Sequence, residues 1–324
     1  MSVVVPTFNR RDRLERVLQA LADQDLDESY EVVVVSDGST DGTDRLLAAG
    51  VPGLTIRYEC QSNSGPAAAR NRGVDLARGD LIVFLDDDVV PAPQFLSMHI
   101  AAHRREGSNA VVVGPMLDPV DHSMSPYVRW EQHMLARQYR AMEEGEFDAT
   151  ARQFYTGNAS VARRHLIASG GFDASYRRAE DFELALRLSD MGLSFHFEPS
   201  AIGWHYAERS YEAWRAIAFE YGRNEMQFAS RGRGWIGDSI RTKYVQKFWP
   251  VRASIGACLR WPHVARLAEY LLRKLASIAE ASGSRRVNRS SLSLIYVIVF
   301  LAGVQAELGS NDAFRRFAAT RTQA

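Results

Sequence analysis

The sequence predicts an α/β fold, in which a mostly parallel sheet is flanked by helices and followed by a helical C-terminal region. Short β-branched runs alternate with helical patterns through the first hundred residues, which is typical of βαβ units. Dense polar clusters follow several of these runs, and beyond Tyr206 the apolar residues recur with helical spacing. We expect one domain over residues 1–220, with halves at 1–114 and 115–220, and a second region over 221–324.

The first predicted strand is Val3–Val5, which leads into the turn-like segment Pro6–Asn9. A helix should follow, because four apolar residues recur three or four positions apart and form one stripe. These residues are Leu14, Val17, Leu18 and Leu21. The continuous apolar run Glu31–Val35 is typical of a strand buried on both faces.

Two further strands complete this half of the predicted sheet. They are expected at Thr55–Tyr58 and Leu81–Leu85, joined by an Ala- and Arg-rich helix that ends before Gly79. From about 115 to 155, aromatic, Met and charged residues mix without a clear period, which predicts a loop-rich or substrate-adapting insert.

Regular patterns return after this insert. The remaining strands are predicted at Gly157–Val161 and Ser194–Glu198. Helices are predicted over Arg164–Ser169, where Gly170-Gly171 end the pattern, and from Glu180 through Leu188.

The composition excludes disordered, collagen-like and disulfide-stapled chains. Of 324 residues, 46% are hydrophobic and 24% are charged, which is enough apolar material for a sizeable core. The two cysteines, Cys60 and Cys258, are far apart in the sequence, which favours a reducing, cytoplasmic compartment.

Three polar clusters are expected to meet at one edge of the sheet. Pro6–Asn9, Asp37–Asp41 and Asp86–Asp88 each follow a predicted strand. In open parallel sheets, ligands bind beyond the carboxyl ends of the strands. The clusters therefore predict a binding site at this edge.

The triplet Asp86-Asp87-Asp88 is a candidate cation site. Adjacent carboxylates repel one another, and burial would raise the pKa of each. A divalent cation removes that cost, and hard oxygen ligands suit Mg²⁺ or Mn²⁺, which commonly also bind substrate phosphates. The alternative is a solvated acidic loop before a helix, but the position after a buried strand favours the cation.

Other polar residues allow two interpretations each. Asp37 could accept hydrogen bonds from a nucleobase or a ribose, or form an Asx turn and a helix N-cap. Arg70 and Arg72 point to different sides of their predicted helix, so one should face the sheet edge and the other solvent.

A carboxylate at the start of the predicted helix over 180–188 is a candidate general base. Glu180 and Asp181 could serve only the helix dipole, but the apolar residues that follow fix the helix to the core. A carboxylate held in this way is well placed to take up a proton. His205 is either a structural histidine or an additional metal ligand.

Six short motifs, in this order, resemble family-2 glycosyltransferases. They are Pro6–Arg10, Val35–Asp41, Asn71–Gly73, Phe84–Asp88, Gly171–Asp173 and Glu180–Asp181. That family has the GT-A fold, a Rossmann-like nucleotide-binding unit fused to an acceptor-binding half. The resemblance covers about residues 2–206 and implies that 1–114 bind the nucleotide and 115–220 the acceptor.

The resemblance also implies how a nucleotide-sugar donor would be held. The backbone around Pro6 and Thr7, with Asp37, would bind the base and ribose, and Arg70 would approach the base. Asn158 would shape the floor under the donor sugar. The predicted donor-binding set is completed by Asn9, Arg10, Asp86 and Asp87.

The metal and the catalytic base follow from the same resemblance. Asp86 and Asp88 correspond to the family's DXD motif, in which Asp88 would ligate the divalent ion and Asp86 would contact the ribose or the metal through water. His205 lies where many relatives add a metal ligand. Asp181 corresponds to the catalytic base, with Glu180 beside it facing the acceptor.

The implied reaction is an inverting transfer to an acceptor hydroxyl on a glycan, a lipid carrier or a small molecule, as in bacterial cell-envelope biosynthesis. Two rival functions are a nucleotidyltransferase and a sugar-nucleotide-binding scaffold without turnover. The first would need a Gly-rich basic loop that Pro6–Asp12 lacks, and the acidic site residues argue against the second.

The C-terminal region is strongly basic. Residues 221–324 carry 17 Lys and Arg against 6 Asp and Glu, with aromatic and aliphatic residues interleaved. The apolar stretch Leu294–Val304 is shorter than the ~20 residues that span a bilayer. The region either lies on an anionic membrane, at the inner face of the cell membrane, or packs as an ordinary helical domain. No nucleic-acid recognition motif accompanies the charge.

Overall fold

The computed structural model describes residues 1–176 and 178–320, which form two compact units. The N-terminal unit contains Met1–Met124 and Glu131–Glu208, and the C-terminal unit contains Ser125–Trp130 and the chain from Arg209. The boundary thus lies at 208/209 and not at the expected 220/221. Residue 220 lies inside α8 (Tyr211–Ser230), and the whole of this helix belongs to the C-terminal unit.

The N-terminal unit is built on a seven-stranded sheet of order β3-β2-β1-β4-β8-β6-β9, in which only β8 is antiparallel to its neighbours. Three short strands form a second sheet of order β5-β10-β7. The strands of the large sheet are β1 (Ser2–Thr7), β2 (Glu31–Asp37), β3 (Ile56–Gln61), β4 (Leu81–Leu85), β6 (Ala110–Val113), β8 (Asn158–Ala162) and β9 (Ser194–Phe197). Those of the small sheet are β5 (Val89–Pro91), β7 (Met116–Leu117) and β10 (Gly203–His205).

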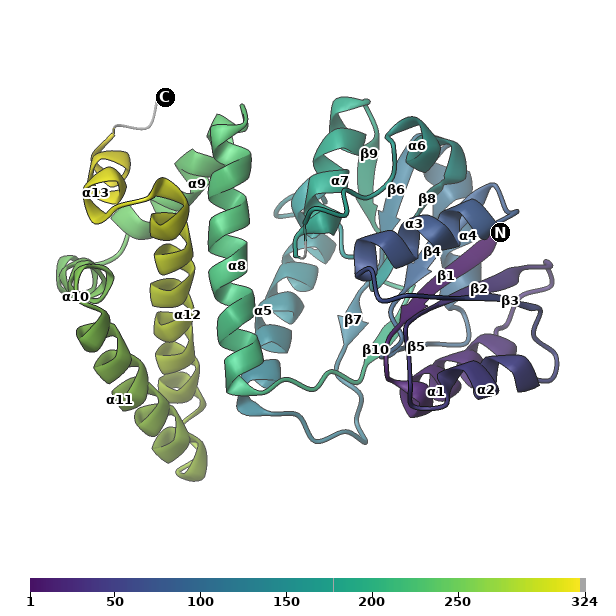
Figure 1. Cartoon of the computed structure of the whole chain (residues 1–324), viewed down its shortest axis with the longest axis horizontal. Coiled ribbons are helices and arrows are strands. Elements are labelled where there is room, and N and C mark those ends of the chain that lie inside the picture. Colours follow the sequence, from purple (N-terminus) through teal and green to yellow (C-terminus); the bar gives the residue numbers. More distant parts are fainter. Residues whose placement is uncertain (177, 321–324) are drawn as a thin grey trace. The chain divides into compact units, whose positions relative to one another are not determined.

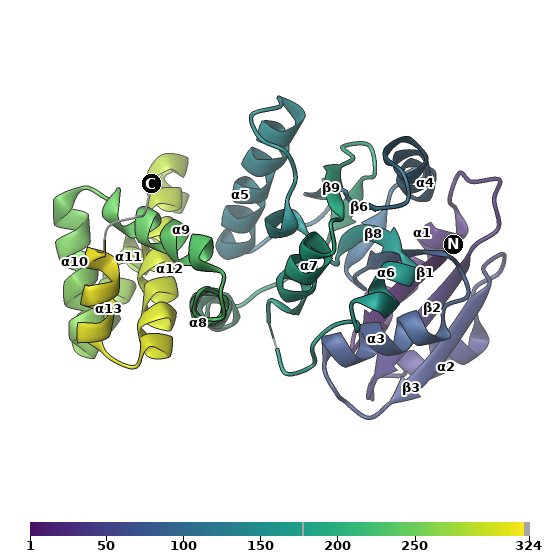
Figure 2. The ribbon, with the colours of Figure 1, turned by 90° about the horizontal axis from the view of Figure 1, so that it is seen from above.

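Helices cover both faces of the large sheet, and Figure 2 shows α3 and α6 on one face and α4 on the other. All four residues of the predicted apolar stripe are buried in α1, which confirms that helix. The close packing of α3 on β1 depends on Gly73, since a Cβ there would collide with the Val4 side chain. The helices of this unit are α1 (Arg11–Ala22), α2 (Thr43–Ala49), α3 (Pro66–Leu76), α4 (Phe95–Glu106), the short 3-10 helix η1 (Ala151–Gln153), α6 (Arg163–Ala168) and α7 (Glu180–Asp190).

The expectation of a loop-rich insert over 115–155 is wrong. The segment contains α5 (Pro126–Glu143), a helix of 18 residues that begins in the C-terminal unit and continues in the N-terminal unit. The buried residues of α5 include the polar Gln132 and the aromatic Trp130 and Tyr139. The sequence therefore shows no aliphatic stripe that would predict this helix. The short strands β5, β7 and β10 were also not predicted, because two or three residues carry no periodic signal.

The C-terminal unit is helical, as predicted, and Figure 1 shows α8, α11 and α12 as long helices lying side by side. Helices α8 and α12 meet at Gly222 and Gly303, where a Cβ on either glycine would collide with the other helix's backbone. The core includes Trp214 from α8 and Ile295 from α12. The other helices are α9 (Gly234–Val245), α10 (Trp249–Arg260), α11 (Pro262–Ala281), α12 (Arg285–Leu308) and α13 (Asn311–Ala319).

Within the described residues, α12 is the one helix whose length and composition would suit a membrane span. Its 18-residue window has a mean hydropathy of 1.8, and half of that window is buried inside the structure. Both cysteines are free thiols, with Cys60 exposed and Cys258 buried.

Candidate active site

The three polar clusters meet at one edge of the large sheet, as predicted. Strands β2, β1 and β4 are adjacent and parallel, so their carboxyl ends lie together. The Thr7 hydroxyl donates to Asp87 Oδ2 at 2.8 Å, which joins the end of β1 to the acidic triplet. The Asn9 Oδ1 accepts from the Thr40 amide at 2.7 Å, which joins the end of β1 to the loop after β2.

The Asp87 side chain stabilises the contact between the end of β1 and the acidic triplet. It is 4% exposed, and its other oxygen accepts from Arg10 at 2.8 Å. Burial raises the pKa of Asp87 to about 6, although the Arg10 charge acts in the opposite direction. The expectation that Asp87 contacts the donor is therefore corrected: its side chain holds Thr7 and Arg10 in place. Asn9 has a similar supporting role and adopts a left-handed backbone (φ 52°), which Asn tolerates better than most residues.

Asp88 and His205 face each other although they are far apart in the sequence. The antiparallel pairing of β5 with β10 sets His205 opposite Val89, directly after the triplet. The His205 Nε2 lies 3.6 Å from Asp88 Oδ1, and both side chains are nearly buried. Gln132 lies 3.0 Å from the other ring nitrogen and fixes the orientation of the ring.

This pair fits a divalent cation. Two ligands that are each about 2.1 Å from one ion lie roughly 3 to 4 Å apart, as these two atoms do. A carboxylate and an imidazole suit Mn²⁺, and Mg²⁺ takes one or two carboxylates together with substrate phosphates. The second Asp88 oxygen accepts from Arg10 at 2.9 Å, and Arg13 lies 3.6 Å away.

Asp86 is not in direct contact with this pair, and its expected contact with the ribose, or with the metal through water, stays a prediction. In the part of the chain that the structure describes, no three His, Cys, Asp or Glu side chains are grouped as a metal site. Asp86 instead accepts a hydrogen bond from Arg70 at 2.7 Å. Although burial alone would raise it, the Arg70 charge keeps the pKa of Asp86 below its ordinary value.

Arg70 is a buried bridge between the triplet and α7. Its guanidinium is bonded to Asp86 on one side and donates to Glu180 Oε1 at 2.9 Å on the other. The expected split between the two arginines is confirmed, since Arg72 binds Glu59 and is half-exposed. The expectation that Arg70 approaches a nucleobase stays a prediction, and in this structure the carboxylates of Asp86 and Glu180 bind the ends of its guanidinium.

Glu180 and Asp181 occupy the first turn of α7, whose buried side chains include Phe182 and Leu184. The Glu180 carboxylate binds Arg70, and its expected position facing the acceptor stays a prediction. The Asp181 Oδ1 accepts from the Phe182 amide at 2.8 Å. Burial, together with the neighbouring Glu180 carboxylate, raises the pKa of Asp181 above its ordinary value.

Asp37 supports the loop before α3. Its Oδ1 accepts from the Gln61 side chain at 2.7 Å and the Ser64 amide at 2.8 Å, and its Oδ2 accepts from the Gly65 amide at 2.9 Å. The carboxylate therefore holds the loop in shape at the sheet edge, close to the alternative in which Asp37 forms a turn. Pro6 is partly exposed near the end of β1, where it pairs with Val35 of β2.

Asn158 lies in the core and not at the donor site. Its side chain is 1% exposed and donates to the carbonyls of Pro115 and Ala201, while its Oδ1 contacts His99. The expectation that Asn158 contacts a donor is corrected, because its amide is fully used in joining β8 to the segments around it.

Two of the motifs form one structural clip. The Asn71 side chain accepts from the Phe172 amide at 2.7 Å and donates to the Phe172 carbonyl at 2.8 Å. Gly171 is required beside it, since a Cβ there would meet the Asn71 Oδ1. The Phe172 ring packs edge-on against Phe84 of β4. The Asn71–Gly73 and Gly171–Asp173 motifs therefore hold the segment before α7 onto α3.

Sequence reasoning missed two residues of the site. Gln132 orients His205 from α5, which was not predicted as a helix, so no signal pointed to it. Arg13 lies in the first turn of α1, three residues after Arg10 at the N-cap, and contacts Asp88 and Glu208. That i, i+3 spacing in the first turns of α1 could have indicated it.

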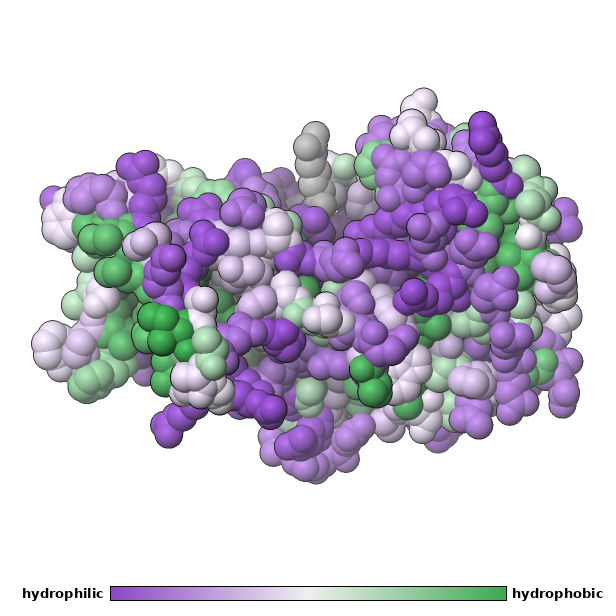
Figure 3. Space-filling view, turned by 90° about the horizontal axis from the view of Figure 1, so that it is seen from below, coloured by the Kyte–Doolittle hydropathy of each residue, from purple (hydrophilic) through white to green (hydrophobic). Residues whose placement is uncertain are grey.

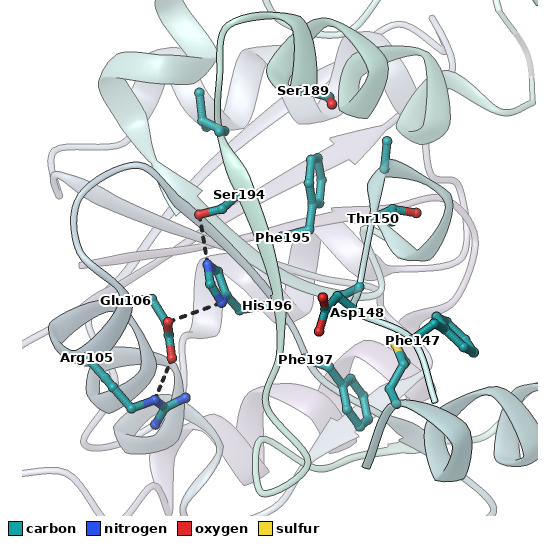
Figure 4. Close-up of a pocket in the computed structure, with 14 residues that line it drawn as sticks. Arg105, Glu106, Phe147, Asp148, Thr150, Ser189, Ser194, Phe195, His196 and Phe197 are labelled. Atoms are coloured by element: carbon teal, nitrogen blue, oxygen red, sulfur yellow. Dashed lines mark hydrogen bonds and ion pairs between the residues drawn. The ribbon is translucent and has the colours of Figure 1, made fainter. Parts of the chain in front are cut away.

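A separate cavity of about 620 Å³ lies along the edge strand β9 (Figure 4). His196 lies between Ser194 and Glu106, at 2.8 Å and 3.2 Å, and Arg105 binds the same glutamate. Phe147, Phe195 and Phe197 line the cavity as well. None of the site residues predicted from the sequence lines this cavity, among those that the structure describes.

Comparisons with known proteins agree with this geometry. The family model described as Glycosyl transferase family 2 matches residues 2–126. Validoxylamine A glucosyltransferase from Streptomyces hygroscopicus subsp. jinggangensis is 33% identical over 243 residues, or 66% of this chain and 57% of that protein. The uncharacterized glycosyltransferase YfnE from Bacillus subtilis is 29% identical over 253 residues, or 63% of this chain and 64% of that protein. The match thus spans less than two thirds of the length of either relative.

A solved structure shows the same arrangement of sheets and helices. Mannosyltransferase PcManGT from Pyrobaculum calidifontis, in complex with GDP-Man and Mn²⁺, superposes with a TM-score of 0.65 and 21% identity. The superposition covers 94% of this chain and 86% of that one. Residues 2–126 therefore match the model of glycosyl transferase family 2, and the chain has the GT-A fold.

Proposed function

We propose that the protein is an inverting glycosyltransferase that moves a sugar from a nucleotide-diphosphate sugar to an acceptor hydroxyl. The observation that carries this proposal is the position of Asp181. It is a carboxylate of raised pKa in the first turn of α7, tied through Glu180 and Arg70 to the acidic triplet. A general base at neutral pH works best when its pKa lies near the operating pH.

The donor nucleotide would bind at the carboxyl ends of β1, β2 and β4. The family assignment of residues 2–126 supports this placement, as does the glucosyltransferase activity named for one relative. The loops are held by Asp37 and by the bond between Asn9 and Thr40, so backbone groups around Pro6 and Thr7 are positioned before a ligand arrives.

Asp88 and His205 would hold a divalent cation, with Gln132 fixing the histidine ring. The Mn²⁺ found with GDP-Man in the mannosyltransferase supports this assignment. A bound cation would supply Lewis-acid stabilisation to the leaving diphosphate. Because Arg10 and Arg13 contact Asp88 in this structure, we expect the arginines to move when the donor binds.

Transfer would proceed by a single displacement. Asp181 takes the proton from the acceptor hydroxyl, and the resulting oxygen attacks the anomeric carbon on the side opposite the diphosphate. The bond between that carbon and the diphosphate oxygen breaks, and the configuration inverts. General-base assistance of this kind contributes ~10²–10⁴-fold to the rate. We propose a cytoplasmic reaction, with a glycan, a lipid-linked saccharide or a small molecule as acceptor.

A donor panel tests this function. Release of nucleoside diphosphate would be measured with UDP-, GDP- and dTDP-sugars, each with Mn²⁺, Mg²⁺ or EDTA, and the anomeric configuration of the product read by NMR. We expect one donor to give metal-dependent release and an inverted product. Asp181→Asn should bind that donor with wild-type affinity but lose transfer, whereas Asp190→Asn, an exposed carboxylate in the last turn of α7, should stay active.

Three outcomes would contradict the proposal. Transfer by Asp181→Asn at the wild-type rate would remove that residue as the base. A product with retained configuration would exclude the single displacement. Donor binding without release, across the whole panel and all acceptors, would favour the binding scaffold.

A further inference from the structure

Helix α11 has apolar side chains on two opposite faces. One face packs into the C-terminal unit through Ala276, Ala279 and Glu269. The opposite face exposes large apolar side chains at helical spacing, with exposed fractions between 45% and 65%. We call this the outer α11 face, and it consists of Leu267, Tyr270, Leu271, Leu275 and Ile278.

Exposed apolar side chains are concentrated around this face. Among the described residues, eight large apolar side chains that are exposed fall between Phe248 and Ile278, including Trp249 and Trp261. In the N-terminal unit such side chains are scattered along the sequence, as Ile167 and Met191 are. Figure 3 shows hydrophobic side chains gathered over the C-terminal unit with hydrophilic ones between them. A concentration of this kind marks an interaction surface.

The charges in the same segment are almost all positive. Between Phe248 and Ile278 the sequence carries five cations and one carboxylate. The carboxylate is Glu269, which is buried and already bonded to Arg215 and Tyr211. The cations are Arg252, Arg260, Arg266, Arg273 and Lys274. An occupant of the outer α11 face must therefore be apolar in part and negatively charged in part.

A second copy of the chain does not meet this requirement. Two outer α11 faces packed together would bring Arg266 and Lys274 of each copy close to the same cations of the other. Both are exposed, and within this segment the one carboxylate that could offset them is buried. Like charges across an apolar seam oppose pairing. An anionic lipid surface supplies both the missing negative charge and an apolar layer.

We propose that the outer α11 face binds the surface of an anionic lipid bilayer, with the helix lying in the headgroup plane. Leu267, Leu271 and Ile278 enter the acyl boundary, while Arg266 and Lys274 contact lipid phosphates. Tyr270 suits the interface, because its ring is apolar and its hydroxyl reaches water. Attachment is peripheral, because the apolar window of α12 is half buried inside the unit and is not needed for contact.

Vesicle cosedimentation of the full chain tests this proposal. Vesicles of phosphatidylcholine with about 30% phosphatidylglycerol would be compared with phosphatidylcholine alone. We expect binding to the anionic vesicles, at least tenfold weaker binding to the neutral ones, and release at about 0.5 M salt. Leu271→Ser with Ile278→Ser, and separately Arg266→Gln with Lys274→Gln, should each lower the partition coefficient by about tenfold.

The matched control is Ile167→Ser, because Ile167 is exposed to the same extent as Leu271, at 56%, but lies on α6. It should bind vesicles as the wild type does. Circular dichroism and release of nucleoside diphosphate with a soluble acceptor would be measured for every variant. Loss of vesicle binding with unchanged turnover separates this inference from the proposed function.

Four results would overturn the inference: equal binding to neutral and anionic vesicles, binding to neither, wild-type binding by the two outer-face variants, or resistance to extraction at alkaline pH, which would indicate a spanning helix. Size-exclusion chromatography with light scattering tests the alternative that a second copy of the chain binds the outer α11 face. A dimer that dissociates in Leu271→Ser with Ile278→Ser would assign the face to self-association instead.

Discussion

Replacing Arg70 by Met tests whether the buried bridge holds the site together. The change removes the guanidinium that binds Asp86 at 2.7 Å and Glu180 at 2.9 Å, and it leaves an uncharged, unbranched stem in its place. Removing one partner of a buried ion pair costs about 3–5 kcal/mol. Asp86 is a third exposed at its side chain, so water replaces part of the lost bond, and we expect about 3 kcal/mol.

Arg72 provides the matched control, because it lies two residues further along the same helix. It binds Glu59 with two hydrogen bonds, but the side chains of both residues are more than a third exposed. Exposed ion pairs contribute at most about 1 kcal/mol, so Arg72→Met should cost less than that. The comparison between Arg70→Met and Arg72→Met thus isolates burial from charge.

The stability lost on replacing Arg70 should also depend on pH, and the direction of this dependence follows from the pKa of Asp86. The Arg70 charge holds the pKa of Asp86 below its ordinary value, so the pair stabilises the folded state fully above that ordinary value. As the pH falls below about 4, the Asp86 carboxylate takes up a proton and this stabilisation is lost. The difference in the free energy of unfolding between wild type and Arg70→Met should therefore be largest near neutral pH and smaller in acid.

Hydrogen exchange followed by mass spectrometry across a urea series is the appropriate assay. Five of the six tryptophans lie in the C-terminal unit, so fluorescence would report mainly on the wrong part of the chain. Peptides from β1, β4 and α3 report on the unit that contains Arg70. The reasoning would be refuted if Arg70→Met and Arg72→Met lowered the free energy of unfolding equally. It would also be refuted if the difference in this free energy between wild type and Arg70→Met did not change with pH.

Three further predictions concern the base, the metal and the packing. Because the pKa of Asp181 is raised, kcat/KM should fall as the pH drops through a value well above 4, and a pH-rate profile without such an acid limb would exclude it. Asp88→Asn should abolish the thermal shift that Mn²⁺ adds to nucleoside diphosphate, and an undiminished shift would place the metal elsewhere. Gly73→Ala should destabilise the N-terminal unit by about 1–2 kcal/mol, because the new methyl group collides with Val4. Gly256 lies in α10 with open space around it, so Gly256→Ala should raise the free energy of unfolding measured by hydrogen exchange by about 1 kcal/mol. If Gly73→Ala and Gly256→Ala both stabilised or both destabilised the chain, the packing argument would be refuted.

The sequence by itself determined the alternation of strands and helices in the first hundred residues. The runs Val3–Val5 and Glu31–Val35, together with the stripe from Leu14 to Leu21, carry periodic signals that depend only on neighbours along the chain. Since parallel strands end at a common edge, these local signals also predicted that the clusters after β1, β2 and β4 would meet.

The tertiary structure decided which side chains of those clusters remain for a ligand. Arg70 was expected near a nucleobase but binds two carboxylates that follow it by 16 and 110 residues. Asn158 was expected near the donor, but its amide donates to the Pro115 and Ala201 carbonyls in the core. His205 lies beside Asp88 only because β10 pairs with β5. Hydrogen bonds over such separations depend on how the strands and helices pack. Periodicity along the chain therefore fixes the elements, whereas the partners of each polar group are chosen by the fold.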